Sequence, residues 1–212
     1  MPTGWLVLGG LKQTEILMSV PKNVARFALG YAALVEGGAA LIRFRERSVA
    51  FASAMERAIA LNRRLVVIGD PDAGFHTRFM RAYGCGDVCV DLNGCPSCPV
   101  TVVADITKGT IPGVADDSAV VFVSCVLEYV VDLDAALQEI SRMAGSAANA
   151  FIVTVQPWTL TARLYPHARW RLSSPSAAST VSLAPVGFEE KLAATAVLGV
   201  LAAAAFWPKG RR

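Results

Sequence analysis

The sequence predicts an α/β fold in which helices flank a parallel sheet of five strands, with apolar helices added near both ends of the chain. Three observations support this class. Short, wholly apolar runs alternate with helical patterns through the middle of the chain, glycine or acidic residues follow these runs, and long apolar stretches lie near both termini. Buried strands that alternate with helices are typical of parallel sheets with right-handed crossovers.

The predicted strands are continuous apolar runs without polar alternation, so both of their faces are expected to be buried. They span residues 64–69, 88–92, 100–105, 119–130 and 150–158, and the last part of the fourth run turns into a loop or helix. The pattern fades after Trp158. The sheet is therefore predicted to end with its fifth strand.

Helices are predicted at residues 48–61, 75–83 and 132–144. The helix at 132–144 has the clearest limits, because Asp132 can cap its start and Gly145 can end it. The helix at 48–61 is amphipathic, and one apolar face is formed by Val49, Ala52, Met55, Ile59 and Ala60.

Four regions follow from these patterns. Residues 1–47 form an apolar helical region, and its segment 24–44 is long enough to span a bilayer. The alternative is a helix or hairpin that covers the sheet domain or lies on the membrane surface. Residues 48–172 form the sheet domain, and residues 173–187 form a linker rich in Ser, Ala and Pro. Residues 188–212 contain a charge-free run that ends in Trp207 and is followed by a basic tail. This pattern favours a membrane anchor over a buried helix or a helix that docks on a partner.

The composition also indicates a membrane as the partner. The chain is 54% hydrophobic and only 17% charged, where soluble domains carry roughly 25% charged residues. The arginines Arg43, Arg45 and Arg47 resemble an interfacial anchor beside the first apolar segment. A net charge of +3 without a basic stripe excludes nucleic acid as the expected partner.

The five cysteines are Cys85, Cys89, Cys95, Cys98 and Cys125. An odd count without a signal peptide predicts a reducing compartment with free thiols, or a disulfide between Cys95 and Cys98. We expect no metal site here. The alternative is one zinc ion held by the first four cysteines, because four thiolates bind zinc tetrahedrally.

Polar residues follow each of the first four predicted strands, where the ligands of open parallel sheets bind. The first strand leads into a turn that contains Gly69, Asp70, Asp72 and Gly74. The second ends near Asp91, at the distance from the glycine turn that is usual for a carboxylate that accepts hydrogen bonds from ribose hydroxyls. Asp105 and Ile106 follow the third strand, and Ser124, Cys125 and Glu128 follow the fourth.

These residues resemble the motifs of the class I S-adenosylmethionine-dependent methyltransferases, over about residues 64–158. The resemblance rests on "VVIGDPDAG", "VCVDLNG" and "VVADITKGTIPGVADDSAVVFVSCVLEYVVDLDAALQEISRMAG", with residues 111–145 the most similar part. It implies a Rossmann-like sheet and S-adenosylmethionine as the cofactor.

The resemblance also implies roles for individual residues. Gly69 and Gly74 would let the backbone approach the methionine part of the cofactor, and Asp91 would hold the ribose. Asp105 and Ile106 would lie by the adenine, and Ser124 near the cofactor and the acceptor.

The chain departs from the family in its first motif. Val67 stands where the family has the acidic residue that meets the cofactor's amino group, and Pro71 with Asp72 replaces the middle glycine. Asp70 or Asp72 is the expected replacement for the lost carboxylate.

Two functions follow. The first is a membrane-associated methyltransferase that acts on a small or lipid-like acceptor. The alternative is a catalytically inactive methyltransferase fold that serves as a structural or interaction subunit of a membrane-associated assembly, such as a cellular complex or a virus particle. Catalytic residues are not assigned, because methyl transfer depends mainly on proximity and orientation.

Overall fold

The computed structural model describes residues 21–73, 81–156, 159–160, 162, 167–173, 182–185, 195–202 and 205. The chain divides into two compact units, Ala39–Val186 on one side and Met1–Gly38 with Gly187–Arg212 on the other. Gly74 and most of the predicted helix 75–83 lie outside the described residues, and residues 81–83 are not helical.

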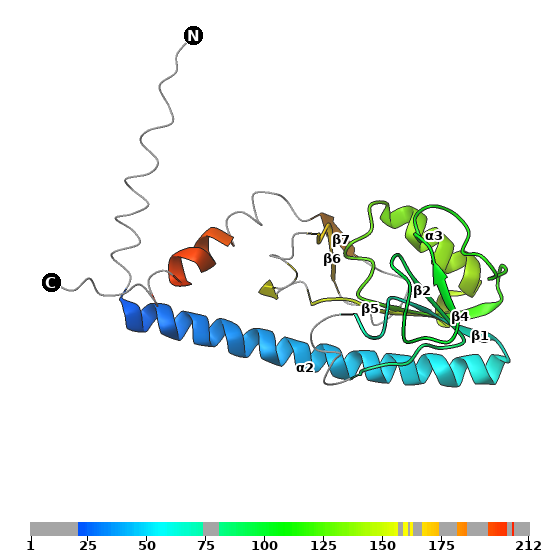
Figure 1. Ribbon diagram of the computed structural model, residues 1–212, viewed down its shortest axis with the longest axis horizontal. Helices are drawn as coiled ribbons and strands as arrows, with labels where there is room; N and C mark the ends of the chain where they lie inside the picture. Colours follow the sequence, from blue (N-terminus) through cyan, green and yellow to red (C-terminus); the bar gives the residue numbers. More distant parts are fainter. Residues whose placement is uncertain are drawn as a thin grey trace, which may run out of the picture. The chain divides into compact units, whose positions relative to one another are not determined.

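The larger unit contains an all-parallel sheet in the Rossmann-like order β3-β2-β1-β4-β5 (Figure 1). The five predicted strands are confirmed, each somewhat shorter than expected: β1 (Arg64–Ile68), β2 (Val88–Asp91), β3 (Thr101–Val103), β4 (Ala119–Ser124) and β5 (Ala150–Val153). Strands β1 and β4 lie at the centre, and every residue of β4 is buried. Their continuous apolar sequence reflects this burial on both faces.

Alternate residues of each strand pack on opposite faces of the sheet. Val66, Ile68 and Val121 belong to the core shared with the helix α3 (Leu133–Ala144). Val67 and Phe122 belong to the second core, which is completed by residues of the helix α2 (Lys22–Leu61). Figure 1 shows α3 and the last turns of α2 on opposite sides of the strands.

The ends of α3 agree with the prediction. The side chain of Asp132 accepts a hydrogen bond from the Ala135 N–H at 3.0 Å, and Gly145 closes the helix in the left-handed conformation with φ of 65°. The helix buries Leu133, Ala136, Ile140 and Met143 against the sheet.

The prediction for the apolar face of residues 48–61 is wrong. These residues belong to one continuous helix of 40 residues, which also contains the segment 24–44. Val49, Met55 and Ile59 are exposed, whereas Ala54 and Ala58 are buried in the second core. The small alanine side chains let the helix backbone lie close to the sheet, and this places the larger apolar side chains on the outer face.

Beyond β5 the chain forms a separate antiparallel pair, β6 (Trp170–Ser173) and β7 (Ser182–Pro185). Strand β7 therefore lies within the predicted linker 173–187. The indole N–H of Trp170 donates to the carbonyl of Val130 at 2.9 Å, and the Arg169 N–H donates to the carbonyl of Glu128 at 2.7 Å. These bonds join β6 to the loop that follows β4.

The smaller unit brings together two of the apolar segments. Ala25 and Ala205 are fully buried there, and Leu29 and Leu201 pack against them. Residues 195–202 are helical, and the rest of the predicted anchor 188–212 lies outside the described residues apart from Ala205. By length and composition, α2 is the one helix of the described part of the chain that could cross a membrane.

Candidate functional site

The carboxyl ends of β1 and β2 bring Asp70 and Asp91 into contact. The Asp70 N–H donates to Oδ2 of Asp91 at 3.2 Å, and the Asn93 N–H donates to Oδ1 of the same carboxylate at 2.9 Å. Asp91 is half-buried at the end of β2. Its two oxygens therefore order the turns after both strands, and each retains room for a further hydrogen bond.

Gly69 is required where β1 meets the end of β4. Its φ of 104° lies in a region that side chains rarely adopt, and a Cβ there would lie 2.9 Å from both the Ser124 carbonyl oxygen and Cγ2 of Val126. Gly69 and Ser124 are thus neighbours, as the sequence predicts for residues at adjacent strand ends.

The turn after Gly69 is held by its own hydrogen bonds. The Tyr83 hydroxyl donates to the Asp70 carbonyl at 3.1 Å, and the Asp72 N–H donates to Oδ1 of Asp70 at 3.0 Å. Pro71 is buried, and the Asp72 carboxylate lies 3.2 Å from Nε of Arg81. Both aspartates that were expected to replace the missing acid already have partners inside the loop.

Asp105 and Ile106 are placed after β3 in a tight turn. The Thr107 N–H and hydroxyl donate to Oδ1 of Asp105 at 3.0 and 2.7 Å, and these hydrogen bonds lower the pKa of the Asp105 carboxyl. Ile106 is buried in the core beneath α3. The structure gives Asp105 a role in closing this turn and leaves Ile106 among the core side chains.

A group of buried and half-buried polar side chains, which we call the polar cluster, lies beside the ends of β4 and β5. It comprises Arg47 from α2, Ser124 from β4, Glu128 from the following loop and Gln156 from the segment after β5. One atom of each has no hydrogen-bond partner among the residues that the structure describes: Nε of Arg47, Oγ of Ser124, Oε2 of Glu128 and Oε1 of Gln156. Buried polar atoms without partners are costly, so four in one place indicate a position for a polar ligand or ordered water.

The remaining contacts fix the polar cluster in place. Oε1 of Glu128 accepts the Val155 N–H, and Nη2 of Arg47 lies 2.8 Å from Sγ of Cys125. Nε2 of Gln156 donates to the Glu46 carboxylate at 2.8 Å. Arg47, Glu128 and Gln156 are thus each held by one side-chain atom, while another has no partner among the described residues.

Burial controls the titration of this region. It raises the pKa of the Glu128 carboxyl to about 7, although the Val155 N–H and the charge of Arg47 act in the opposite direction. It also raises the pKa of the Cys125 thiol to about 11 and that of the Tyr83 hydroxyl to about 12. The nearby Ser124 side chain lowers the pKa of Tyr83, but its Oγ lies outside hydrogen-bond geometry.

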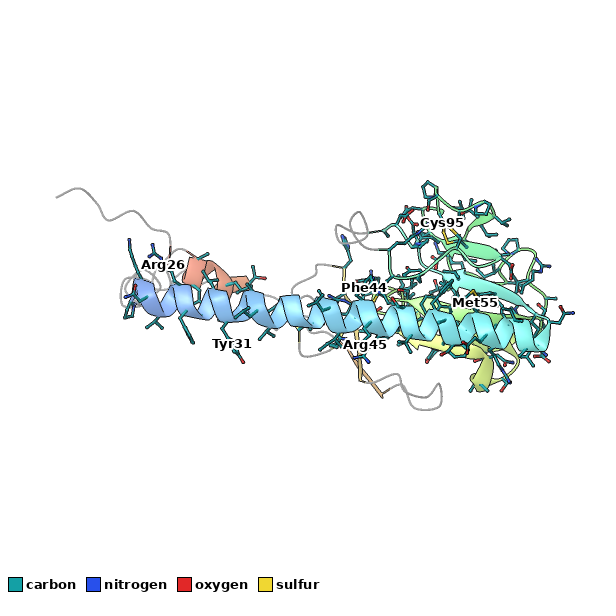
Figure 2. The ribbon with its side chains drawn as sticks, turned by 90° about the horizontal axis from the view of Figure 1, so that it is seen from below. Arg26, Tyr31, Phe44, Arg45, Met55 and Cys95 are labelled. Atoms are coloured by element: carbon teal, nitrogen blue, oxygen red, sulfur yellow. A yellow bond between two sulfur atoms is a disulfide. The ribbon has the colours of Figure 1, made fainter. Side chains whose placement is uncertain are left out.

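Sequence reasoning missed the role of the α2 arginines. Arg43 is buried and Arg47 half-buried beside the sheet, whereas Arg45 is exposed and points to the other side of the helix (Figure 2). The signal was their spacing, because residues four apart share one helix face. Glu128 stood in the family-like segment, and nothing in the sequence indicated Gln156.

Several residues of the family-like segment 111–145 stabilise the fold. Oε1 of Glu139 accepts the Ile111 N–H at 2.7 Å, and Arg142 binds Glu139, Asp116 and the Val114 carbonyl. These contacts join the loop before β4 to α3. The contacts described for these residues are therefore structural.

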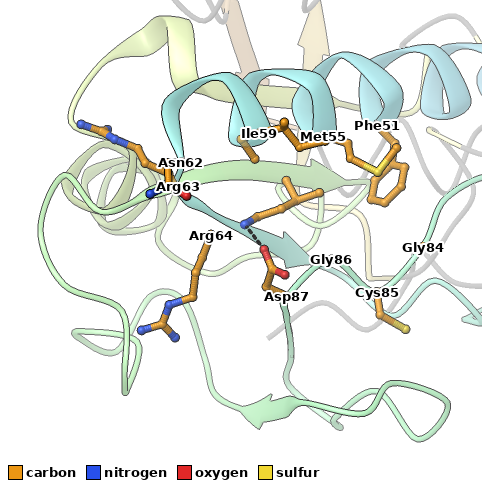
Figure 3. Close-up of a pocket in the computed structure, with 12 residues that line it drawn as sticks. Phe51, Met55, Ile59, Asn62, Arg63, Arg64, Gly84, Cys85, Gly86 and Asp87 are labelled. Atoms are coloured by element: carbon orange, nitrogen blue, oxygen red, sulfur yellow. Dashed lines mark hydrogen bonds between the residues drawn. The ribbon is translucent and has the colours of Figure 1, made fainter.

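A surface pocket of about 700 Å³ lies at the opposite edge of the sheet (Figure 3). It is lined by α2 residues including Met55 and Ile59, by the start of β1 and by Asp87, whose carboxylate accepts the Leu65 N–H at 2.7 Å. Ligands of parallel sheets bind beyond the carboxyl ends of the strands, whereas this pocket lies at the amino ends of β1 and β2.

The cysteine predictions need correction. Four cysteines form two disulfides, Cys85–Cys98 and Cys89–Cys95, and Cys125 is free. The expected Cys95–Cys98 bond is wrong because β2 and the preceding loop bring Cys89 and Cys85 against the Cys-x2-Cys segment. The disulfides also argue against a reducing compartment.

Comparison with protein-family models, with curated protein sequences and with solved structures gave no match. The strand order and the residues at the carboxyl ends of the strands remain as the indications of function.

Proposed function

We propose that the chain is a membrane-associated S-adenosylmethionine-dependent methyltransferase that acts on a small or lipid-like acceptor. The observation that carries the proposal is the contact of the Asp70 N–H with the Asp91 carboxylate, next to Gly69 and Ser124. The glycine turn after β1, the acidic residue at the end of β2 and the end of the central strand β4 thus lie together. Nucleotides bind at this edge in Rossmann-like sheets.

Asp91 supports the ribose site. Each of its oxygens accepts one backbone N–H, and a carboxylate oxygen has a second lone pair for a hydroxyl donor. The half-buried position of Asp91 leaves it reachable from this edge. Asp91 would therefore orient the sugar without giving up the bonds that hold the two turns.

The polar cluster supports a site for the methionine end of the cofactor. That end carries an ammonium and a carboxylate, and the cluster offers a guanidinium from Arg47 together with unpartnered oxygens of Glu128, Ser124 and Gln156. Glu128 would then replace the family's acid, whose position holds the fully buried Val67. Charge-assisted hydrogen bonds of this kind are stronger than neutral ones.

Little acid–base chemistry is required of the chain. The cofactor supplies an electrophilic methyl group on a sulfonium, and the protein's task is to align it with the acceptor and exclude water. The apolar α2 helix would keep the domain near lipid-like acceptors.

Calorimetric titration of the full chain with S-adenosylmethionine tests the proposal. We expect micromolar binding that Asp91→Ala abolishes and Glu128→Gln weakens. Asp87→Ala is the matched control, because it removes a carboxylate that also accepts a backbone N–H, at the opposite edge of the sheet. Absence of heat at millimolar cofactor, with the chain folded by circular dichroism, would overturn the enzyme assignment.

The loop after β1 favours the alternative of an inactive structural or interaction subunit. Pro71 is buried and offers no N–H, and the Tyr83 hydroxyl occupies the Asp70 carbonyl. If this alternative holds, the chain associates with membranes but gives no cofactor heat in the same titration.

A further inference from the structure

The four disulfide-bonded cysteines form a single sulfur cluster. The Sγ atoms of Cys89, Cys95 and Cys98 all lie within 4.8 Å of one another, and the Sγ of Cys85 is bonded to that of Cys98. The two disulfides are therefore neighbours. Cys89, Cys95 and Cys98 are buried in the core between the sheet and α2.

The backbone holds this cluster from three segments. Cys85 lies in the loop before β2, Cys89 in β2, and Cys95 and Cys98 in the loop that leads to β3. Figure 2 shows the position of Cys95. The Cys95 N–H donates to Oγ1 of Thr101 at 2.9 Å, and the Cys98 N–H donates to the Cys95 carbonyl at 3.0 Å. The second bond closes the Cys-x2-Cys segment into a turn.

These distances suit a metal ion as well as disulfides. In a tetrahedral site with Zn–S bonds of about 2.3 Å, neighbouring sulfur atoms lie roughly 3.8 Å apart. The sulfur atoms of Cys89, Cys95 and Cys98 are already within 4.8 Å of one another, so side-chain rotations would bring these three to that spacing. Cys85, bonded to Cys98 in the oxidised chain, would supply the fourth sulfur atom. Cys-x2-Cys is also the usual spacing of two ligands of one zinc ion.

We propose that the reduced chain binds one zinc ion through Cys85, Cys89, Cys95 and Cys98. Four thiolates around Zn²⁺ carry a net charge of −2, and Nη2 of Arg81, 3.6 Å from Sγ of Cys85, compensates part of it. A phosphine reaches this state by reducing the disulfides. Two phosphines and two waters give two phosphine oxides and four thiols, and zinc binding then releases four protons.

The zinc ion would stabilise the same connections that the disulfides make. It would join the loop before β2, β2 itself and the loop after it, while Cys125 stays outside the site. The readout is metal content, so the result does not depend on whether the chain binds S-adenosylmethionine.

The test uses the full chain, reduced with a phosphine without oxygen, loaded with zinc and then passed through a desalting column. We expect one zinc ion per chain by elemental analysis, and with cobalt the visible bands of a tetrahedral thiolate complex. Cys95→Ser and Cys98→Ser should lose the ion. The matched control Cys125→Ser should retain it.

Three results would overturn the proposal. They are a reduced, folded chain without bound zinc, retention of zinc by Cys98→Ser, and iron with acid-labile sulfide in place of zinc. If reduction unfolds the chain, refolding on addition of zinc supports the site, and failure to refold with zinc present contradicts it.

Discussion

At the scale of single residues, Glu128 connects the loop after β4 with two other parts of the larger unit, the segment after β5 and the start of β6. Its side chain accepts the Val155 N–H, and its carbonyl accepts the N–H groups of Arg169 and Trp170. Its remaining carboxylate oxygen is buried without a partner among the described residues. A carboxyl in this setting favours its neutral form, because burial penalises the charge.

Glu128→Gln is predicted to change how stability depends on pH. The pKa of Glu128 is about 7 in the folded chain, against an ordinary value of 4.5, so the folded state binds the extra proton between these values. The free energy of unfolding of the wild type should therefore fall as pH rises from about 4.5 to 7, and then stay level.

The amide of Glu128→Gln does not titrate, so the variant lacks this fall. We measure the melting temperatures of both proteins by circular dichroism from pH 4 to 8. The melting temperature of the variant, relative to that of the wild type, should rise as pH increases from about 4.5 to 7. A difference that stays constant over the whole range would show that Glu128 has no raised pKa.

At the scale of elements, the end of α3 is fixed by the loop before β4. Gly145 adopts a φ of 65°, and the Asp117 N–H donates to the Arg142 carbonyl at 2.8 Å. Asp117 also pairs with Arg63 at 2.6 Å, which links this corner to the start of β1. The helix end, the loop and the first strand thus meet at one point.

Gly145→Ala is predicted to destabilise the chain more than Gly113→Ala does. Both glycines have positive φ, 65° and 77°, so both alanines bear a left-handed cost of about 1–2 kcal/mol. The new Cβ at residue 145 would also lie 1.8 Å from Oδ1 and 2.7 Å from Cβ of Asp117, whereas nothing lies within 4 Å at residue 113.

Chemical denaturation of the two variants measures this difference. We expect the free energy of unfolding to fall by roughly 1–3 kcal/mol more in Gly145→Ala than in Gly113→Ala, which is the usual range for overpacking. Equal losses would mean that Asp117 moves aside without cost.

At the scale of the whole molecule, one helix belongs to both compact units. The last turns of α2 pack on the sheet through Phe51, Ala54 and Ala58. Its earlier turns expose large apolar side chains, with Phe27 76% and Leu34 77% exposed. Such a surface is unusual for a soluble protein and typical of a helix that contacts lipid or a partner.

Replacement of Phe27 and Leu34 by Asp in one variant is predicted to release the full chain from lipid vesicles in a flotation assay. Two carboxylates at these positions would have to enter the apolar layer, which is strongly unfavourable. The matched control is Ile59→Asp. The Ile59 side chain is also exposed, at 74%, but it lies in the part of α2 that packs on the sheet. If the double variant still floats while Ile59→Asp does not, the membrane contact lies at the other end of α2.

The sequence alone predicted the class of fold, the five strands and the limits of α3. These features depend on local signals, namely continuous apolar runs, an Asp cap and a terminal glycine, which act over a few residues. It also predicted that Gly69, Asp91 and Ser124 follow strands that share one edge, because parallel strands end on the same side.

Only the tertiary structure decided which face of α2 is buried, how the cysteines pair and which side chains form the polar cluster. Alanine and larger apolar residues alternate along α2, and the packing on the sheet buries Ala54 and Ala58 while Met55 and Ile59 stay exposed. The cysteines are close in sequence, but their pairing depends on how β2 and the loops on either side of it fold. The polar cluster joins residues far apart in the chain, Arg47 and Gln156 among them. Their proximity results from the packing of β2, β4, β5 and α2, which no local pattern specifies.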